Sequence, residues 1–293
     1  MPERAVLLMA YGTPARPEDV EAYYTDIRRG RPPSPEQLAD LVRRYDAIGG
    51  VSPLTERTEA QRAALQRALG DDTPVVLGFK HVSPTIEEAM ASLDADHIVG
   101  LVLAPHHSAL SVGEYLERAR KAAGDREVVG IESWATLPAY VEFLTAAVLE
   151  TLASMPDGTK VLFTAHSLPA RVRAMGDPYV DELRSTASAV ATKAGLHPWA
   201  QWSIAWQSAG RTPEPWLEPD VLTVIAELAG TGRGTGLLVC PCGFVADHLE
   251  VLYDLDIEAK AAAEGAGLAF ARTPVVNDDP SVMAALAELV RRA

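Results

Sequence analysis

The sequence predicts an α/β protein with two lobes, each built on a parallel sheet that is flanked by helices. Short β-rich runs alternate with longer helical patterns along the whole chain, which is typical of parallel sheets with covering helices. The chain has 293 residues, 48% of them hydrophobic, which is enough for one large core or two smaller ones. A polar, turn-rich stretch at 154–160 lies near the middle, so we expect an N-terminal lobe over 1–153 and a C-terminal lobe over 154–293.

The individual elements follow from the spacing of apolar residues along the chain. Short runs rich in β-branched residues predict strands, at 5–10, 75–79, 98–104, 128–131, 161–165, 202–206 and 237–240. Longer stretches with apolar residues at helical spacing predict helices, at 17–27, 35–48, 55–69, 84–93, 112–123, 141–154, 179–194, 221–228, 246–265 and 281–292.

The composition excludes several functional classes. With 26 Lys+Arg against 40 Asp+Glu, the net charge is −14, which disfavours nucleic acid and anionic membranes as general partners. No apolar run reaches the roughly 18–20 residues that span a bilayer, and the N-terminus has the pattern of a buried strand rather than of a signal peptide. Cys240 and Cys242 cannot form a disulfide framework. We therefore expect a cytoplasmic protein that is not an integral membrane protein and does not bind nucleic acid.

Two strand ends deliver polar residues that could bind a ligand. In open α/β sheets, ligands bind outside the carboxyl ends of the strands. The first strand of the N-terminal lobe leads into Tyr11, and the first strand of the C-terminal lobe leads into His166. A histidine after a buried strand is often only structural, but this position at a strand end favours a functional role. Two lobes that face each other would place Tyr11 and His166 on opposite walls, which suits a flat molecule with a metal at its centre.

An acidic row lies in the predicted helix at 246–265. Glu250, Asp254 and Glu258 are spaced i, i+4, i+8, so on an α-helix they form one stripe with steps of about 6 Å. Such carboxylates usually make a solvated face. Apolar residues are interleaved with them here, so we expect a half-buried helix whose acidic row is a path for a divalent cation. His166 with Glu250 would offer nitrogen and oxygen donors that suit Fe²⁺.

A basic cluster lies near the N-terminus, with a glycine-rich turn after it. The guanidinium groups are either ordinary surface charges or a site for carboxylates, which arginine binds in a bidentate manner. The turn that follows has Gly49 and Gly50, which allow close backbone approach, and Ser52, which offers a hydroxyl group. The cluster consists of five arginines, Arg28, Arg29, Arg31, Arg43 and Arg44.

Nine short motifs occur in a fixed order between about residue 5 and about residue 290, and together they resemble the ferrochelatase family. The similarity is greatest to the soluble coproporphyrin type of Gram-positive bacteria. The motifs are AYGTP at 10–14, YY at 23–24, IRRGR at 27–31, IGGVSPL at 48–54, LAPH at 103–106, TAHSLP at 164–169, WQS at 206–208, PWLEPD at 215–220 and GFVADHLEVLYD at 243–254.

The resemblance implies a lyase that inserts Fe²⁺ into coproporphyrin III to give coproheme, in haem b biosynthesis. It implies that Tyr11 ligates the iron of the bound metalloporphyrin. It also implies that His166 and Glu250 bind the metal and accept protons on the opposite face. The other positions that match the family contact the porphyrin (Arg28, Arg44, Tyr45, Ser52, Tyr115), continue the acidic row (Asp254, Glu258) or line the cleft (His81, Trp216).

The resemblance also implies the architecture and the partners. We expect a monomer of two Rossmann-like lobes with four-stranded parallel sheets, an active-site cleft between them, and a last helix at about 281–292 that packs back on the first lobe. Fe²⁺ is expected as a substrate. The iron–sulfur cluster of some relatives needs four cysteines, and this chain has two. A transient contact with the next enzyme of haem synthesis is compatible with this scheme.

Three alternatives remain at this stage. A ferrochelatase that acts on protoporphyrin IX would need fewer cationic groups, because that porphyrin has two propionates where coproporphyrin has four. A cobalt or nickel tetrapyrrole chelatase would share the fold and similar ligands, although the arginine cluster and Tyr11 favour the iron type. A solute-binding module with two lobes would need a secretion signal and no acidic metal row.

Overall fold

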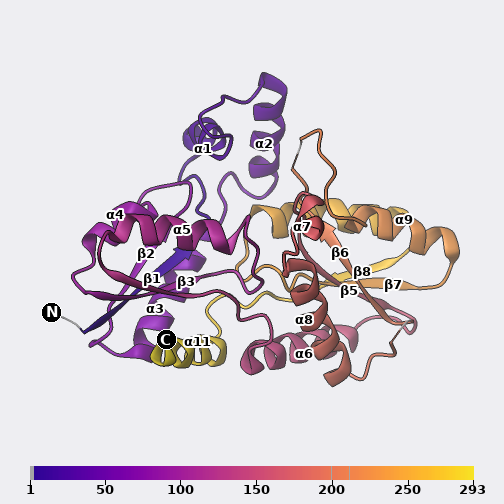
Figure 1. Ribbon diagram of the computed structural model, residues 1–293. Coiled ribbons are helices and arrows are strands. Elements are labelled where there is room, and N and C mark those ends of the chain that lie inside the picture. The colour runs from indigo at the N-terminus through magenta and orange to yellow at the C-terminus, as the bar shows by residue number, and fades with distance from the viewer. Residues whose placement is uncertain (1–2, 199, 211) are drawn as a thin grey trace.

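Two separate four-stranded parallel sheets organise the chain in the computed structural model, which describes residues 3–198, 200–210 and 212–293 (Figure 1). The predicted class, two parallel four-stranded sheets flanked by helices, is thereby confirmed. The first sheet has the order β2-β1-β3-β4, with β1 Arg4–Ala10, β2 Val75–Phe79, β3 His97–Val102 and β4 Glu127–Ile131. The second has the order β6-β5-β7-β8, with β5 Lys160–His166, β6 Trp202–Gln207, β7 Gly236–Cys240 and β8 Ala269–Arg272.

The central strands are apolar on both faces because helices cover both sides of each sheet. In β1, Leu7 and Met9 face the core beneath α4 and α5, whereas Val6 and Leu8 face the opposite core. That second core continues into the other lobe and includes Phe163 of β5. One apolar core therefore joins the two sheets on one side, and each sheet has a smaller core of its own on the other side.

The helices occupy both faces of each sheet, and several begin at side chains that cap the first turn. Ser34 and Thr85 each accept a hydrogen bond from the backbone N–H three residues later, which satisfies a helix N-terminus. The helices are α1 Val20–Ile27, α2 Pro35–Ala47, α3 Leu54–Leu69, α4 Ile86–Ser92, α5 Val112–Ala123, α6 Pro138–Leu152, α7 Arg171–Ala174, α8 Tyr179–Lys193, α9 Val221–Thr231, α10 Lys260–Gly265 and α11 Pro280–Arg292. A short 3₁₀ turn, η1, spans Pro17–Asp19, and a π-helix, η2, spans Glu250–Ala259.

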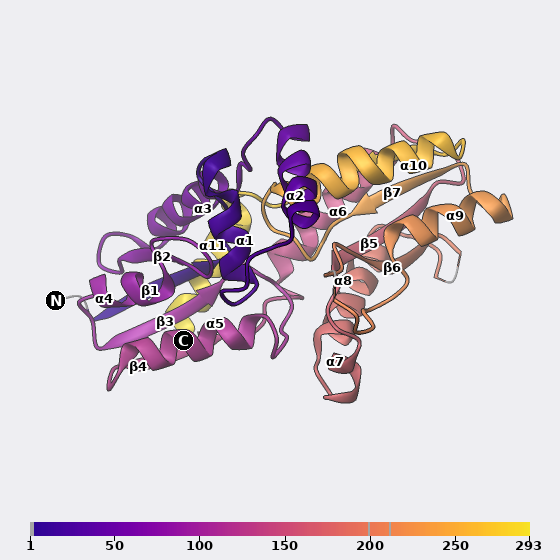
Figure 2. The same ribbon diagram turned by 90° about the horizontal axis from the view of Figure 1, so that it is seen from above.

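The two lobes exchange helices. The last helix, α11, packs on α3 beneath the first sheet (Figure 1 and Figure 2). The guanidinium of Arg4 donates to the carbonyl of Val290 at 3.0 Å. Conversely, α6 precedes β5 in the chain but packs on the strand β7 and the helix α8 of the second lobe. Packing therefore groups α6 with the C-terminal lobe, and the division of the chain at 153–154 stays a prediction.

Three elements differ from the sequence-based expectations. β8 and the four-residue α7 were not among the expected elements, because each is too short to show a period. The expected α-helix at 246–265 is wrong over 246–248, which are not helical, and over Glu250–Ala259, where the backbone forms the π-helix η2. Among the described residues, every helix is too short or too polar to cross a membrane.

Candidate active site

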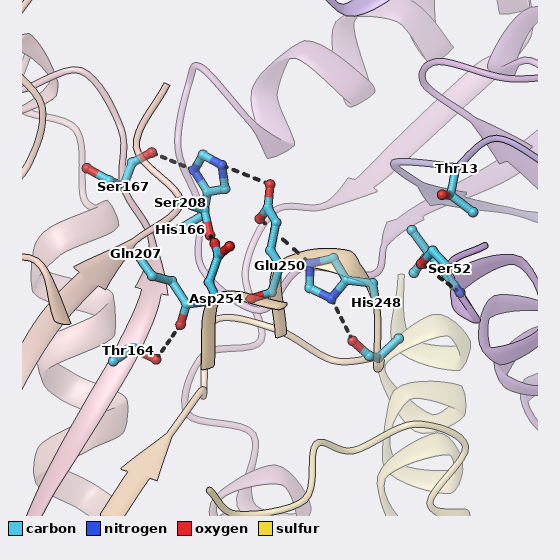
Figure 3. A network of polar contacts seen from close by, with 12 residues as sticks. Thr13, Ser52, Thr164, His166, Ser167, Gln207, Ser208, His248, Glu250 and Asp254 are labelled. Atoms are coloured by element: carbon cyan, nitrogen blue, oxygen red, sulfur yellow. Dashed lines mark hydrogen bonds and ion pairs between the residues drawn. The ribbon is translucent and has the colours of Figure 1, made fainter. Parts of the chain in front are cut away.

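His166 ends β5, so its side chain projects from the carboxyl edge of the second sheet. Its Nδ1 lies 2.5 Å from the carbonyl oxygen of Ser167, and its own carbonyl accepts a hydrogen bond from the hydroxyl of Tyr179 at 2.9 Å. A carbonyl oxygen only accepts, so Nδ1 carries the proton in this contact. The other ring nitrogen, Nε2, faces Glu250 at 3.5 Å from Oε1 (Figure 3).

Glu250 lies between two imidazole rings. Its second oxygen, Oε2, is 3.7 Å from Nε2 of His248, whose Nδ1 in turn lies 2.9 Å from the carbonyl oxygen of Ala246 (Figure 3). Both histidines thus use Nδ1 on a backbone carbonyl and present Nε2 to the same carboxylate. No spacing pattern in the sequence singles out His248. Its only signal was its place in the motif at 243–254, two residues before Glu250.

Close backbone contact brings the segment that carries Glu250 to the end of β5. The N–H of Gly243 donates to the carbonyl of Thr164 at 2.8 Å, and a Cβ at Gly243 would lie 2.3 Å from the Cβ of Ala165. Only glycine fits there. Gln207 at the end of β6 ties the arrangement together, because its side chain bonds Thr164 and donates to the backbone carbonyl of Glu250 at 3.2 Å.

The charges of His166 and Glu250 stabilise each other. Burial disfavours the imidazolium, but the charge of Glu250 and its hydrogen bond outweigh that effect and raise the pKa of His166 to about 9. Burial likewise disfavours the carboxylate. The charge and hydrogen bond of His166, with a smaller contribution from His248, nevertheless hold the pKa of Glu250 well below its usual range. Without substrate, the pair is therefore an imidazolium and a carboxylate at neutral pH.

The π-helix carries the acidic row away from this pair. π-Helices are rare and occur frequently at functional sites. Asp254 is buried, accepts a hydrogen bond from Ser208 and lies 3.2 Å from a guanidinium nitrogen of Arg44. Burial and the charge of Glu250 raise the pKa of Asp254 to about 6, although Ser208 and Arg44 act in the opposite direction. Asp254 is therefore part of a buried polar network rather than of a solvated face, and Glu258 is half-buried.

A cavity of about 190 Å³ adjoins the acidic row. That volume holds several water molecules but is too small for a tetrapyrrole. Within the described parts of the chain, no three His, Cys, Asp or Glu side chains converge as a ready metal site, so a cation here would keep water ligands. The polar part of the cavity wall comes from Arg44, Gln207, Ser208, Asp220, Asp254 and Glu258.

Tyr11 presents its ring from the first lobe. It follows β1 and is 42% exposed, and its ring lies 4.5 Å from the ring of His81, centroid to centroid. The Nδ1 of His81 is 2.7 Å from a carboxylate oxygen of Asp26, which fixes the imidazole behind the phenol. Desolvation raises the pKa of Tyr11, and the negative charges of Glu250, Glu114 and Asp26 act in the same direction.

Other expected porphyrin-contacting residues of the first lobe are buried in the structure. The hydroxyl of Tyr45 lies 3.1 Å from that of Thr13, and burial raises the pKa of Tyr45 to about 12. Ser52 is buried, and its hydroxyl oxygen accepts from the N–H of Leu54 at the start of α3. Tyr115 on α5 is also buried, with the ammonium of Lys80 5.0 Å from its ring centroid.

The arginine cluster divides into two groups. Arg44 bonds Asp40 as well as Asp254, and Arg43 bonds Asp40 and the hydroxyl of Tyr253, so both side chains tie α2 to the π-helix. Arg28, which ends α1, lies instead over the ring of Tyr24 at 5.6 Å and donates to the carbonyl of Arg31. The structure thus gives Arg44 internal carboxylate partners that the sequence analysis did not foresee.

Trp216 lies beside the loop that follows His166. It pairs with Pro169 in an isolated bridge, and the neighbouring Leu217 donates its N–H to the carbonyl of Leu168 at 2.9 Å. A Cβ at Gly210 would come within 2.4 Å of the indole ring, so this loop packs tightly on itself. Trp216 therefore adjoins the site without a direct contact to the His166–Glu250 pair.

The chain is similar to known proteins over nearly its whole length. A sequence model described as ferrochelatase matches residues 3–293. Among curated relatives, the coproporphyrin III ferrochelatase of Bacillus subtilis (strain 168) is 42% identical over 97% of this chain and 96% of its own length. That of Anoxybacillus flavithermus is 43% identical over 97% and 94%.

Solved structures that are similar to this chain support the fold. SirB from Bacillus subtilis, determined with Fe³⁺, has a TM-score of 0.58 and 14% identity, over 99% of this chain and 95% of SirB. A cobalt complex of the sirohydrochlorin chelatase SirB from Bacillus subtilis subspecies spizizenii has a TM-score of 0.51 and 15% identity, over 99% and 94%. The whole-length sequence match and the shared fold lead to one assignment: the chain belongs to the ferrochelatase family.

Proposed function

We propose that this protein inserts Fe²⁺ into a porphyrin, specifically coproporphyrin III, and so makes coproheme for haem b. The observation that carries the proposal is the position of Glu250 between the Nε2 atoms of His166 and His248, at the carboxyl end of β5. The charge of Glu250 contributes to the raised pKa of Tyr11 in the first lobe, which supports a place for Tyr11 on the other side of the same site. The macrocycle would lie between Tyr11 on one face and the His166–Glu250 pair on the other.

The charge state of the pair suggests how metal entry and proton release are coupled. Insertion exchanges two pyrrole N–H protons for one Fe²⁺ ion, so the site must accept protons. Glu250 keeps the pKa of His166 high in the free enzyme. A cation at Glu250 would cancel that carboxylate's charge and lower the pKa of His166. His166 would then release its Nε2 proton to solvent, and the neutral Nε2 could accept the two pyrrole protons one after the other and pass each to solvent as Fe²⁺ binds the macrocycle.

The acidic row and its cavity offer a path for the cation. Asp254 and Glu258 line a space that holds several waters, and Glu250 lies one step further along the π-helix. Carboxylate and water ligands suit a partly hydrated divalent ion. We propose that Fe²⁺ moves along this row as a substrate, with Arg44 compensating the charge of Asp254 while the row is empty.

The substrate is proposed from charge and from the relatives. A tetra-anionic porphyrin that approaches a chain of net charge −14 needs local cations. We propose that Arg28, Arg29 and Arg31 supply them. The side chain of Arg29 is 84% exposed, and its guanidinium lies 3.9 Å from a carboxylate oxygen of Glu114. We further propose a cytoplasmic monomer without an iron–sulfur cluster, since the whole sequence has only Cys240 and Cys242.

One steady-state comparison tests the proposal. The purified protein is supplied anaerobically with Fe²⁺ and either coproporphyrin III or protoporphyrin IX, and product formation is followed by absorbance. We expect a higher kcat/KM for coproporphyrin III. Parallel assays with Co²⁺ and Ni²⁺ test the alternative metals. Faster insertion into protoporphyrin IX would contradict the substrate assignment, and a preference for Co²⁺ or Ni²⁺ would contradict the metal assignment.

A further inference from the structure

We propose that Asp177 and Glu182 are positioning residues that hold the two lobes in register at the active site. They precede and begin α8 in the second lobe, yet their carboxylates bind loops of the first lobe. The inference rests on the proposed function, because it assigns these residues to the geometry that porphyrin metallation needs. Neither residue touches the His166–Glu250 pair directly.

Glu182 holds two loops of the first sheet with one oxygen atom. Its Oε2 accepts a hydrogen bond from the backbone N–H of His107 at 2.6 Å and another from the hydroxyl of Ser133 at 2.8 Å. His107 lies in the loop after β3, and Ser133 lies in the loop after β4. A single carboxylate of the second lobe therefore fixes the carboxyl ends of two neighbouring strands of the first lobe.

Asp177 connects the start of α5 to the start of α8. Its Oδ2 accepts from the hydroxyl of Ser108 at 2.9 Å and from the N–H of Ala109 at 2.8 Å. Its other oxygen accepts from the N–H of Tyr179 at 3.0 Å, in the first turn of α8. The carbonyl of Ser108 accepts from the N–H of Gly113 at 2.9 Å, in the first turn of α5. Asp177 thus joins two helix N-termini that belong to different lobes.

One face of α8 carries this contact to the active site. Tyr179, Glu182 and Thr186 are spaced i, i+3 and i+7, so they lie on the same side of the helix. Thr186 bonds Nε2 of the buried His106, again from the loop after β3, at 2.9 Å. Tyr179 donates to the backbone carbonyl of His166. The same helix face therefore holds the first-lobe loop and the backbone of the expected base.

The consequence is a fixed distance between the two walls of the site. Tyr115 lies one turn into α5, whose start is held by Asp177 through Ser108. His166 is held by Tyr179, whose N–H is bonded by the same Asp177. If this connection were loosened, Nε2 of His166 would shift relative to a macrocycle that is bound between the lobes. Displacements of about 1 Å at a reacting group can cost about a hundredfold in rate.

The test uses variants that separate geometry from charge. Glu182→Gln keeps an oxygen that can accept both hydrogen bonds, because only Oε2 is used in the structure. Glu182→Ala removes the acceptor. Asp177→Asn replaces one of the two carboxylate oxygens by an NH₂ group, which donates and does not accept. Because both oxygens of Asp177 accept from backbone N–H groups, one of these hydrogen bonds is lost in either orientation of the amide. Asp181→Ala is the matched control, since Asp181 is an exposed residue in the same turn of α8.

Two readouts are compared in the full-length protein. Spin labels on cysteines introduced at the exposed positions Glu117 of α5 and Arg184 of α8 report the separation of the lobes, and the native Cys240 and Cys242 are buried. Iron insertion into coproporphyrin III gives kcat and KM. Urea unfolding confirms that each variant is folded under the assay conditions.

We expect Glu182→Ala and Asp177→Asn to broaden the distance distribution and to lower kcat by about tenfold or more. KM should change far less, because propionate contacts are retained. Glu182→Gln and Asp181→Ala should resemble the wild type in both readouts. A fall in kcat without a broader distribution, or broadening without a fall in kcat, would overturn the inference. If the wild type itself inserts no iron, the proposed function fails instead, and a distance distribution unchanged in Glu182→Ala would still refute the tie between lobes.

Discussion

Replacing Glu250 by Gln should change the pH dependence of stability in a direction that the structure fixes. The pKa of His166 is about 9 in the folded protein because of Glu250, against about 6.5 for an unperturbed histidine. Below pH 6.5 both states bind the proton and the stabilisation is complete. Between pH 6.5 and 9 the unfolded state loses the proton first, so the stabilisation decreases as pH rises, and above 9 it is gone.

The magnitude follows from the shift and the exposure of the pair. The difference between a pKa of about 9 and one of 6.5 for His166 corresponds to roughly 3.4 kcal/mol of unfolding free energy if it is fully realised. The side chains of His166 and Glu250 are 35% and 33% exposed, so solvent screening reduces the expected effect to about 1–2 kcal/mol. The wild type should therefore lose about 1–2 kcal/mol of unfolding free energy relative to Glu250→Gln between pH 6.5 and 9.

Urea unfolding of metal-free protein at several pH values within this range measures the difference directly. Groups that titrate equally in both proteins cancel when the two curves are subtracted. Glu258→Gln serves as the control, because Glu258 lies two steps further along the π-helix and bonds neither histidine. Parallel curves for the wild type and Glu250→Gln would refute the claim that Glu250 raises the pKa of His166.

The remaining predictions concern rate, stability and binding. His166→Ala should lose most iron insertion, by about a hundredfold or more, while coproporphyrin still quenches protein fluorescence. Glu250→Gln should slow insertion more than Glu258→Gln in metal titrations, and equal effects would contradict the proposed path. Burial lowers the pKa of His106 to about 3. The unfolding free energy of the wild type should therefore fall by up to about 1.4 kcal/mol per pH unit below pH 6.5. Urea unfolding at several pH values should show a less steep fall for His106→Asn. Arg28→Ala should weaken coproporphyrin binding about tenfold and protoporphyrin less, by fluorescence titration at low salt; equal affinities would place the propionates elsewhere.

Much of the fold was predictable because the central strands are fully buried. Residues 5–10 and 161–165 are apolar on both faces, a pattern that predicts strands of a parallel sheet under two helical layers. β8 was missed because Ala269–Arg272 is a half-buried edge strand whose four residues show no period. The return of α11 to the first lobe was expected only from the family resemblance, and the packing of α6 on the second lobe was not expected. Pattern alone predicts neither, because both depend on which sheet each helix covers.

The site was predictable where function depends on residues next to a strand end. Tyr11 directly follows the buried strand β1, and His166 is the last residue of the buried strand β5. Their position on opposite sides of one site stays a prediction. His248 could not be identified in this way. Its role depends on the turn between Gly243 and Glu250, which orients its Nε2 toward the carboxylate, and no spacing rule describes that turn. The π-helix likewise depends on tertiary contacts, because residues 250–259 have an ordinary helical composition.

The arginine cluster shows why counting charges does not identify a binding site. Arg28 and Arg44 are both parts of one basic segment in the sequence, and either could bind a carboxylate ligand. In the folded chain, Arg44 meets Asp254, a residue 210 positions away, whose carboxylate is buried and therefore needs a cation close by. Arg28 instead follows the last residue of α1, donates to the backbone carbonyl of Arg31, and lies near the exposed Arg29 and Arg31. The charges of Asp254 and Arg44 neutralise each other. A ligand that bound Arg44 would therefore leave the carboxylate of Asp254 without a cation, unless a second cation took the place of Arg44. We propose that a porphyrin carboxylate would recruit Arg44 only together with Fe²⁺, because the metal ion would replace Arg44 as the cation beside Asp254. Occupancy of the acidic row would then be coupled to binding of the macrocycle.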